Sequence, residues 1–355
     1  MFQHSQSPDS ELSGRTNRVL AIPLAIRRIA TSSKTHAEQV GQSSTGNDMP
    51  APGLYRAAVD VLGIAVETSV VRRWARWLAP ASQPFFLTAG EAVDLGLTPD
   101  RAGRDLSAEL RDTYEVWNLP TGLEVVWLDE HMFHAQARNV RAALVRAQVR
   151  RGRGAVPAIS DWADIVDAQV LREQADGHRF VWWPTLVQTC TDAILKRVIV
   201  SDGHLPCQRK AVPVAIWRAA ASTLPHARAL SGTFANGSGA NCFGTVMAAS
   251  GVQSAAEAWM HQEPFEAWLA DNSAVGGTDD LPGTVLVWRG ADRASQHSAV
   301  TLGGGWGLHK PSQSWATPRQ VLTMHDLIRT APPGVTLDRY SLREAAARTA
   351  LVEPA

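Results

Sequence analysis

The chain has 355 residues, 45% of them hydrophobic, so it is long enough for two domains and can bury a substantial core. It holds 34 Lys plus Arg against 34 Asp plus Glu, a balance that excludes the basic composition typical of proteins binding nucleic acid or an anionic membrane. The three cysteines are too few for a disulfide framework and favour a reducing compartment. No apolar stretch reaches about 18 residues, and the short run at 19–26 ends in two arginines, so we predict no membrane span, no secretory signal and a cytoplasmic location.

The first part of the chain combines a polar segment with mixed secondary-structure patterns. Residues 1–52 are rich in Ser, Thr, Gln, Asn and Gly, which predicts a flexible tail. Apolar residues recur at helical spacing from 53 to 78, and Pro80 and Pro84 end that predicted helix. We expect 53–210 to form a mixed α/β domain of unknown type. Its other predicted elements are helices at 105–114, 139–149 and 160–173, strands at 123–128 and 180–183, and a helix running into a strand at 186–200.

The second part predicts an α+β domain over 211–335, followed by a C-terminal tail or helix over 336–355. Gly303-Gly304-Gly305 has the composition of a tight hairpin turn between two strands. We therefore expect a small antiparallel sheet with a helix that begins at Cys242 packed on it. The predicted elements are helices at 212–224, 242–250, 254–261 and 265–269, and strands at 284–288, 298–302 and 306–310.

Cys242 is the leading candidate for a reactive side chain. It follows a loop rich in Gly, Ser and Asn, and it precedes a small, apolar stretch that predicts a helix. A cysteine attacks as a thiolate, and the unpaired N–H groups and positive dipole end of a helix N-terminus lower a thiol pKa. The same N–H groups can bind a tetrahedral oxyanion, with Asn241 and Ser238 as further donors.

Two histidines downstream supply the base that such a thiol needs. His297 begins one predicted strand, and His309 lies twelve positions later, across the glycine hairpin. Antiparallel pairing should bring His309 beside His297, where it can fix the tautomer and orientation of the base. Trp306 and Trp315 flank His309 and are candidates for the wall of a substrate cleft.

Residues 212–330 resemble the catalytic domain of the NlpC/P60 cysteine peptidases, which have a papain-like fold. The family has Asp-Cys-Ser-Gly-Phe at the start of the nucleophile helix, and this chain has Asn241-Cys242-Phe243-Gly244-Thr245. The family's Pro-Gly-Asp turn before a strand is matched by Pro282-Gly283-Thr284. A histidine opening a strand that ends in a glycine-rich hairpin is matched by 297–305, and the third polar residue by His309.

The resemblance implies that Cys242 is the nucleophile, His297 the base and His309 the residue that orients it. It implies an acyl-enzyme intermediate that water or an amine resolves, with no metal or organic cofactor. The departures at Asn241, Phe243 and Thr284 weaken the link to cell-wall peptides. We therefore predict a cysteine hydrolase, amidase or acyltransferase acting on a small peptide or another amide, with no nucleic-acid or membrane partner.

Other groupings of reactive side chains are weaker. His204 and Cys207 could form a second thiol–imidazole pair, or a zinc site with His178 and Cys190, but the spacing does not match a common ligand pattern. The segment 129–134 holds His131 and His134 without the order of a zinc-peptidase motif. A different class of function also stays open, because a papain-like domain can lose its chemistry and serve as a binding or scaffold module.

Overall fold

The computed structural model describes residues 58–100, 105–117, 120–174, 177–201 and 203–343. All of these lie within one compact unit, residues 38–355. The predicted tail at 1–52 lies outside the described residues. Within the described ranges, no helix combines the length and the apolar character needed to cross a membrane.

The described chain begins with a β-hairpin followed by a helix. Strands β1 (Ala58–Val61) and β2 (Ile64–Glu67) pair antiparallel, and α1 (Thr68–Leu78) follows directly. The prediction of one helix from 53 to 78 is therefore wrong in its first half. Leu62 and Gly63 have φ of 54° and 77°, as a two-residue hairpin turn requires, and β-branched residues alternate on both sides of it.

A second two-stranded sheet and several helices complete this part of the chain. Strand β3 (Ser82–Leu87) pairs with β4 (Glu124–Asp129), which confirms the predicted strand at 123–128. Helix α5 confirms the predicted helix at 139–149. The helices along this segment are α2 (Ala89–Asp94), α3 (Ala108–Thr113), α4 (Glu130–Ala135), α5 (Arg138–Arg150), α6 (Ala168–Gln174), α7 (Pro184–Thr189) and α8 (Thr191–Ser201).

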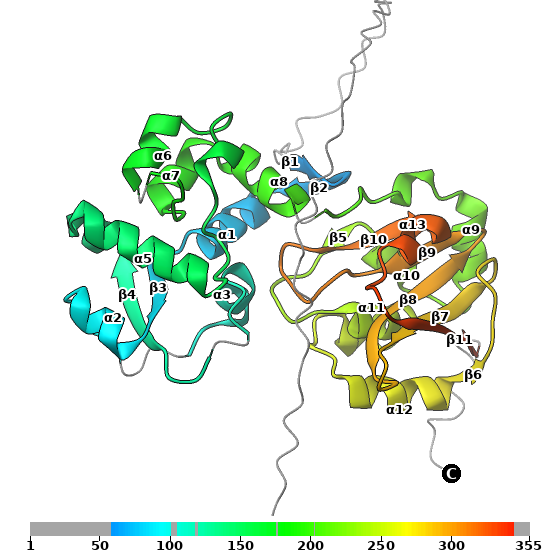
Figure 1. The fold of residues 1–355 in the computed structure, drawn as a ribbon. Helices are drawn as coiled ribbons and strands as arrows, with labels where there is room; N and C mark the ends of the chain where they lie inside the picture. Colours follow the sequence, from blue (N-terminus) through cyan, green and yellow to red (C-terminus); the bar gives the residue numbers. More distant parts are fainter. Residues whose placement is uncertain (1–57, 101–104, 118–119, 175–176, 202, 344–355) are drawn as a thin grey trace, which may run out of the picture. The chain divides into compact units, whose positions relative to one another are not determined.

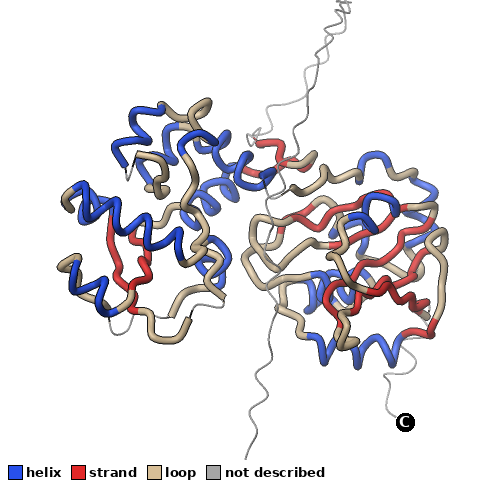
Figure 2. The backbone as a smooth tube through the Cα atoms, in the orientation of Figure 1, coloured by secondary structure: helices blue, strands red, loops and turns tan. Residues whose placement is uncertain are grey.

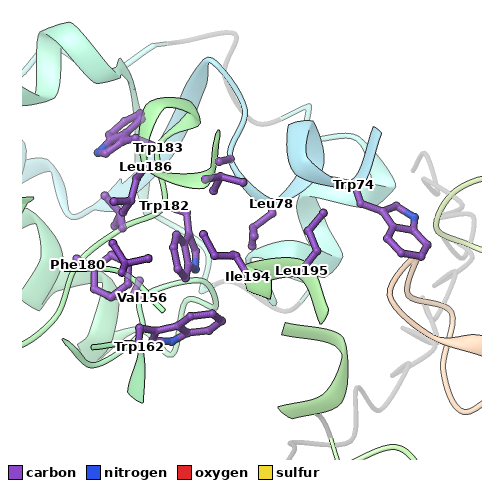
Figure 3. Packing of buried hydrophobic residues seen from close by; sticks show 14 of the residues in the cluster. Trp74, Leu78, Val156, Trp162, Phe180, Trp182, Trp183, Leu186, Ile194 and Leu195 are labelled. Atoms are coloured by element: carbon purple, nitrogen blue, oxygen red, sulfur yellow. The ribbon is translucent and has the colours of Figure 1, made fainter. Parts of the chain in front are cut away.

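Three predicted elements in this segment are wrong, and at 180–183 a run of buried aromatic and apolar residues has the composition of a strand without forming one. The segment 160–173 is a 3-10 helix (Ile159–Asp161) and then α6, and 186–200 spans two helices with no strand. Residues 180–183 are extended but form no strand. Their side chains fill a core in which Trp162, Phe180 and Trp182 meet edge to face (Figure 3).

A seven-stranded antiparallel sheet organises the rest of the chain (Figure 1). Its order is β5-β10-β9-β8-β7-β11-β6. The predicted strands at 284–288, 298–302 and 306–310 are confirmed, and so is the hairpin at Gly303–Gly305. The strands are β5 (Thr233–Phe234), β6 (Ser273–Val275), β7 (Pro282–Arg289), β8 (Ser295–Gly303), β9 (Trp306–His309), β10 (Pro318–Thr323) and β11 (Thr336–Leu342).

Strand β11 corrects the prediction of a tail or helix over 336–355. Residues 336–342 lie between β7 and β6 and pair antiparallel with both. Their side chains are mostly half-buried and include Asp338, Arg339 and Ser341, so the segment lacks the apolar run that would indicate a central strand. Residues 344–355 lie outside the described range.

Helices cover both faces of the sheet, as the tube in Figure 2 shows in blue and red. One face packs on α9 (Val214–Ala220), α10 (Ala227–Leu230), α11 (Cys242–Ala249) and α12 (Gln262–Asn272), and the other packs on α13 (Met324–Arg329). The predicted helix at 254–261 is only a 3-10 helix (Gln253–Ala256), and α12 begins after it. The fold is mixed α+β with antiparallel sheets, as the sequence predicts.

Candidate active site

Cys242 is the first residue of α11, and Asn241 caps that helix. The Asn241 side chain accepts a hydrogen bond from the Gly244 N–H at 3.0 Å, and its Nδ2 donates to the Met260 carbonyl at 2.7 Å. The cap satisfies one of the free N–H groups of the first turn. These two contacts use Oδ1 and one N–H of the Asn241 amide, so the role of its second N–H as an oxyanion donor stays a prediction.

Gly244 allows the first turn of α11 to pack closely on the following 3-10 helix. A Cβ atom at this position would clash with the carbonyl oxygen of Ala255 and come within 3.2 Å of that of Ala258. Glycine at the third position of the helix is therefore required by packing. This holds the helix start, and Cys242 with it, at a fixed place over the sheet.

Cys242 is only 7% exposed, and its thiol lies beside Ser298 of strand β8. Burial raises the pKa of the thiol, and this effect outweighs the N–H groups of Ser298 and Phe243 and the Ser298 hydroxyl, which lower it. The Ser298 hydroxyl is itself buried and has no nitrogen or oxygen partner among the described residues. The resting sulfur is thus a neutral thiol surrounded by groups that can stabilise negative charge.

His297 and His309 meet as the hairpin predicts. His297 Nε2 lies 3.2 Å from His309 Nδ1, and the two rings are nearly perpendicular, at 85°. Burial lowers the pKa of His297 to about 4. Burial also lowers the pKa of His309 well below its ordinary value, with smaller contributions from the positive charges of His297, His204 and Lys310. Both rings are therefore neutral at neutral pH, and each carries one N–H.

Gln320 of β10 completes this row of side chains. It pairs with His309 in the β9–β10 register, is 1% exposed, and places its Nε2 3.1 Å from His309 Nε2. Gln320 is not among the predicted site residues, because its strand, β10, is not among the predicted strands. A prediction of that strand in register with β9 would have placed Gln320 opposite His309.

The thiol and the histidine pair belong to opposite faces of β8. Ser298 pairs with Val287, whose side chain lies in the core under α11, whereas His297 pairs with Trp288 in the core under α13. Successive side chains of a strand alternate in this way. Among the described residues, no hydrogen bond joins the Cys242 thiol to the His297 ring. The nucleophile and the base therefore both adjoin the start of β8 without touching.

Lys310 is a buried cation next to this site. Its ammonium group donates to the carbonyls of Ser312 and Ser314 and to the Thr317 hydroxyl, at 2.7, 2.8 and 2.7 Å. Burial, as the largest cause, lowers the pKa of Lys310 to about 7. The three bonds hold the loop 310–317 in place, and this loop in turn packs on the segment before the nucleophile.

Two other predicted site residues have structural partners or lie at a distance. The Ser238 hydroxyl accepts a hydrogen bond from the Trp315 N–H at 3.2 Å, and the neighbouring Gly239 N–H donates to the Gln313 carbonyl at 2.9 Å. Trp306 is at the far end of β9 from His309, about 10 Å along the strand at the usual rise per residue. Its position does not support a direct role beside the imidazoles.

The rival thiol and histidine groupings do not assemble into a metal site. Over the described ranges, no three side chains of His, Cys, Asp and Glu gather as they would around a metal ion. Cys190 points its thiol at the Ile165 carbonyl at 3.5 Å, and Cys207 accepts from the Val321 N–H at 3.4 Å. Both cysteines therefore have local contacts typical of a structural role.

Comparisons with known proteins leave the chain without a family assignment. No protein-family model, no curated protein and no solved structure matches it.

Proposed function

We infer that the protein is a thiol-dependent amide hydrolase or acyltransferase with Cys242 as nucleophile, His297 as base and His309 as the residue that orients the base. The observation that carries the proposal is the buried imidazole pair, held at 3.2 Å on the strand whose next residue, Ser298, adjoins the thiol. The NlpC/P60-like arrangement described from the sequence gives the same order of roles.

In this mechanism Cys242 Sγ attacks the substrate carbonyl carbon while its proton passes to His297. The oxyanion forms next to the N–H groups of Cys242 and Phe243, which already lower the thiol pKa and therefore lie close to the sulfur. When the tetrahedral intermediate collapses, the leaving amine takes the proton from His297. Water or another amine then attacks the thioester and gives its proton to His297, which passes it to the departing Cys242 sulfur and so restores the free thiol.

Because Cys242 and His297 lie on opposite faces of β8, contact between thiol and base requires the start of this strand to turn His297 to the α11 face. The β7–β8 pairing shifts between Trp288 and Arg289, close to His297. Such irregularities re-aim side chains next to active sites, and catalytic hydrogen bonds often tighten only when a substrate is bound. The neutral state of both groups favours proton transfer during the attack over a preformed thiolate–imidazolium pair.

The test uses p-nitrophenyl acetate, an activated ester that acylates nucleophilic cysteines without a dedicated binding site. We expect a burst of p-nitrophenol and the mass increase of one acetyl group on Cys242. The acetylation rate should fall as the pH drops through about 4, because His297 is then protonated and cannot accept the thiol proton. Mass spectrometry of the peptides that contain each cysteine locates the acetyl group.

Matched variants separate this proposal from the alternative of a catalytically silent module. Cys242→Ala and His297→Ala should each abolish the burst, whereas Cys190→Ser and Cys207→Ser should keep it. The absence of a thiol–imidazole hydrogen bond favours the silent module as the second candidate. Slow acetylation of all three cysteines, unchanged in His297→Ala, would establish that alternative and reject the enzyme.

A further inference from the structure

Gln320 is a buried amide at the end of the imidazole row. Its side chain has one hydrogen-bond contact, to His309 Nε2, and its Oε1 has no partner among the described residues. Both ring nitrogens of His309 are therefore engaged, Nδ1 by His297 and Nε2 by Gln320. The two ends of an amide side chain have nearly the same shape, so the contact alone admits either Nε2 or Oε1 facing the ring.

The orientation of that amide decides the positions of the protons in both rings. If Oε1 faces His309, His309 must carry its proton on Nε2, and its Nδ1 then accepts from His297 Nε2–H. His297 Nδ1 is left with a lone pair, and this nitrogen has no hydrogen bond among the described residues. If Nε2 faces His309 instead, every proton moves to the other nitrogen, and His297 Nδ1 carries a hydrogen.

We propose that Gln320 is the positioning residue of the site, with Oε1 accepting from His309 Nε2–H so that His297 keeps an unprotonated Nδ1, the tautomer that can accept the thiol proton once the start of β8 has turned. The inference rests on the proposed function, because only this arrangement lets His297 accept the Cys242 proton. It extends the predicted triad by one residue, which acts through His309 and does not touch the substrate.

The direct test is the tautomer of each ring in the wild-type protein, read from the nitrogen chemical shifts of 15N-labelled histidine. We expect both His297 and His309 to be protonated on Nε2 at about pH 7, since both are neutral there. Protonation of both rings on Nδ1 would overturn the proposal. This measurement does not depend on whether Cys242 reacts.

Two substitutions at Gln320 give opposite expectations for the two amide orientations. In Gln320→Glu the carboxylate can only accept, so the wild-type tautomers should persist; if the native amide donated instead, this variant would switch them. The charges facing His309, from His297, His204 and Lys310 when protonated, are all positive, so a carboxylate there should also raise the pKa of His309. Gln320→Leu keeps the shape and removes the acceptor, so both tautomers should become populated.

Acetylation kinetics complete the test. The acetylation rate should fall about 10- to 100-fold in Gln320→Leu and recover in Gln320→Glu, a rescue that a merely structural role would not produce. Gln208→Leu is the matched control, because Gln208 also contacts β10, through the Thr323 N–H, but has no contact with either histidine. If Gln320→Leu fails to fold, the histidine tautomers of the wild type and of Gln320→Glu still show which end of the Gln320 amide faces His309.

The outcomes separate the two proposals. Suppose that Cys242→Ala and His297→Ala abolish acetylation, but Gln320→Leu changes neither the acetylation rate nor the tautomers. The positioning role of Gln320 is then rejected, and the proposed enzymatic activity is retained. If both rings are protonated on Nε2 but Cys242 is not acetylated, the proposed enzymatic activity is rejected and the proposed orientation of the Gln320 amide is retained.

Discussion

Lys310 combines full burial with three oxygen partners, a setting in which the charge of the ammonium group is costly to maintain. Its hydrogen bonds favour the charged form, yet burial lowers its pKa from 10.5 to about 7. The loop 310–317, which packs on the segment before the nucleophile, therefore depends on a group that changes its charge near neutral pH.

This depressed pKa makes the stability of the protein depend on pH. Between about pH 7 and 10.5 the unfolded chain keeps the Lys310 proton that the folded chain has lost, so the unfolded state binds more protons. The free energy of unfolding should then rise with pH in this window, by at most about 1.4 kcal/mol per pH unit from this group. Urea unfolding at several pH values should show this increment in the wild type and not in Lys310→Met. Equal slopes in the two proteins would contradict the lowered pKa.

At the scale of single elements, the start of α11 depends on close contact between two helical segments. Gly244→Ala should lower the free energy of unfolding by about 1–3 kcal/mol, because its methyl group would meet the carbonyl oxygens of Ala255 and Ala258. Thermal or urea unfolding measures this loss. The matched control is Gly90→Ala in helix α2, where the nearest atom to an added Cβ is 4.0 Å away.

The control should be neutral or stabilising by up to about 1 kcal/mol, because alanine favours a helix more than glycine does. Similar effects of the two substitutions would indicate that helix propensity, and not packing, governs position 244.

The sequence predicts the elements around the site better than those farther away, for physical reasons. The hairpin from His297 to His309 is encoded locally by three glycines and flanking apolar residues, so its strands and the imidazole contact follow from the pattern. By contrast, β11 pairs with strands far away in the sequence and has a half-polar composition. Its place in the sheet depends on tertiary partners that no local pattern reveals.

The site itself was predictable only in part. The sequence places Cys242 at a helix start and pairs the histidines. The Asn241 cap is local, to the Gly244 N–H three residues on, whereas the second contact of Asn241, with the Met260 carbonyl, spans 19 residues. Gln320 was missed because its partner His309 lies on another strand. Lys310 was missed because its burial depends on tertiary packing, although its hydrogen-bond partners lie within seven residues. The strand period predicts that Ser298 and His297 face opposite sides of the sheet. Only the position of α11 shows that Ser298, and not His297, lies beside the thiol.

At the scale of the whole molecule, Arg289 connects four elements. Its guanidinium group binds Glu266 of α12, Ser295 of β8, and Asp338 and Tyr340 of β11. The Arg289 side chain is 9% exposed, whereas its acidic partners Glu266 and Asp338 are half-buried, so the loss of these bonds leaves partly desolvated carboxylates without their partner. The network ties the C-terminal strand to the sheet and to the helix layer over it.

Removal of this guanidinium group should destabilise the fold strongly. Arg289→Leu is expected to lower the free energy of unfolding by about 3 kcal/mol, as for other buried ion pairs that lose one member. Arg293→Leu removes an arginine that also binds Asp338 but is 63% exposed, and it should cost less than about 1 kcal/mol. Urea unfolding of both variants provides the comparison, and equal losses would show that Arg289 is effectively solvated.

The β8–β9 hairpin also determines which of two neighbouring residues His297 encounters. A slip of one residue in this pairing would turn every side chain of β9 to the opposite face of the sheet. Lys310 would then take the place of His309, and a cation would face the base in place of a neutral ring. In the observed pairing, three hydrogen bonds hold Lys310 on the face of the sheet opposite to His309. The buried lysine that shapes the neighbouring loop therefore also fixes the register of the strand that carries His309.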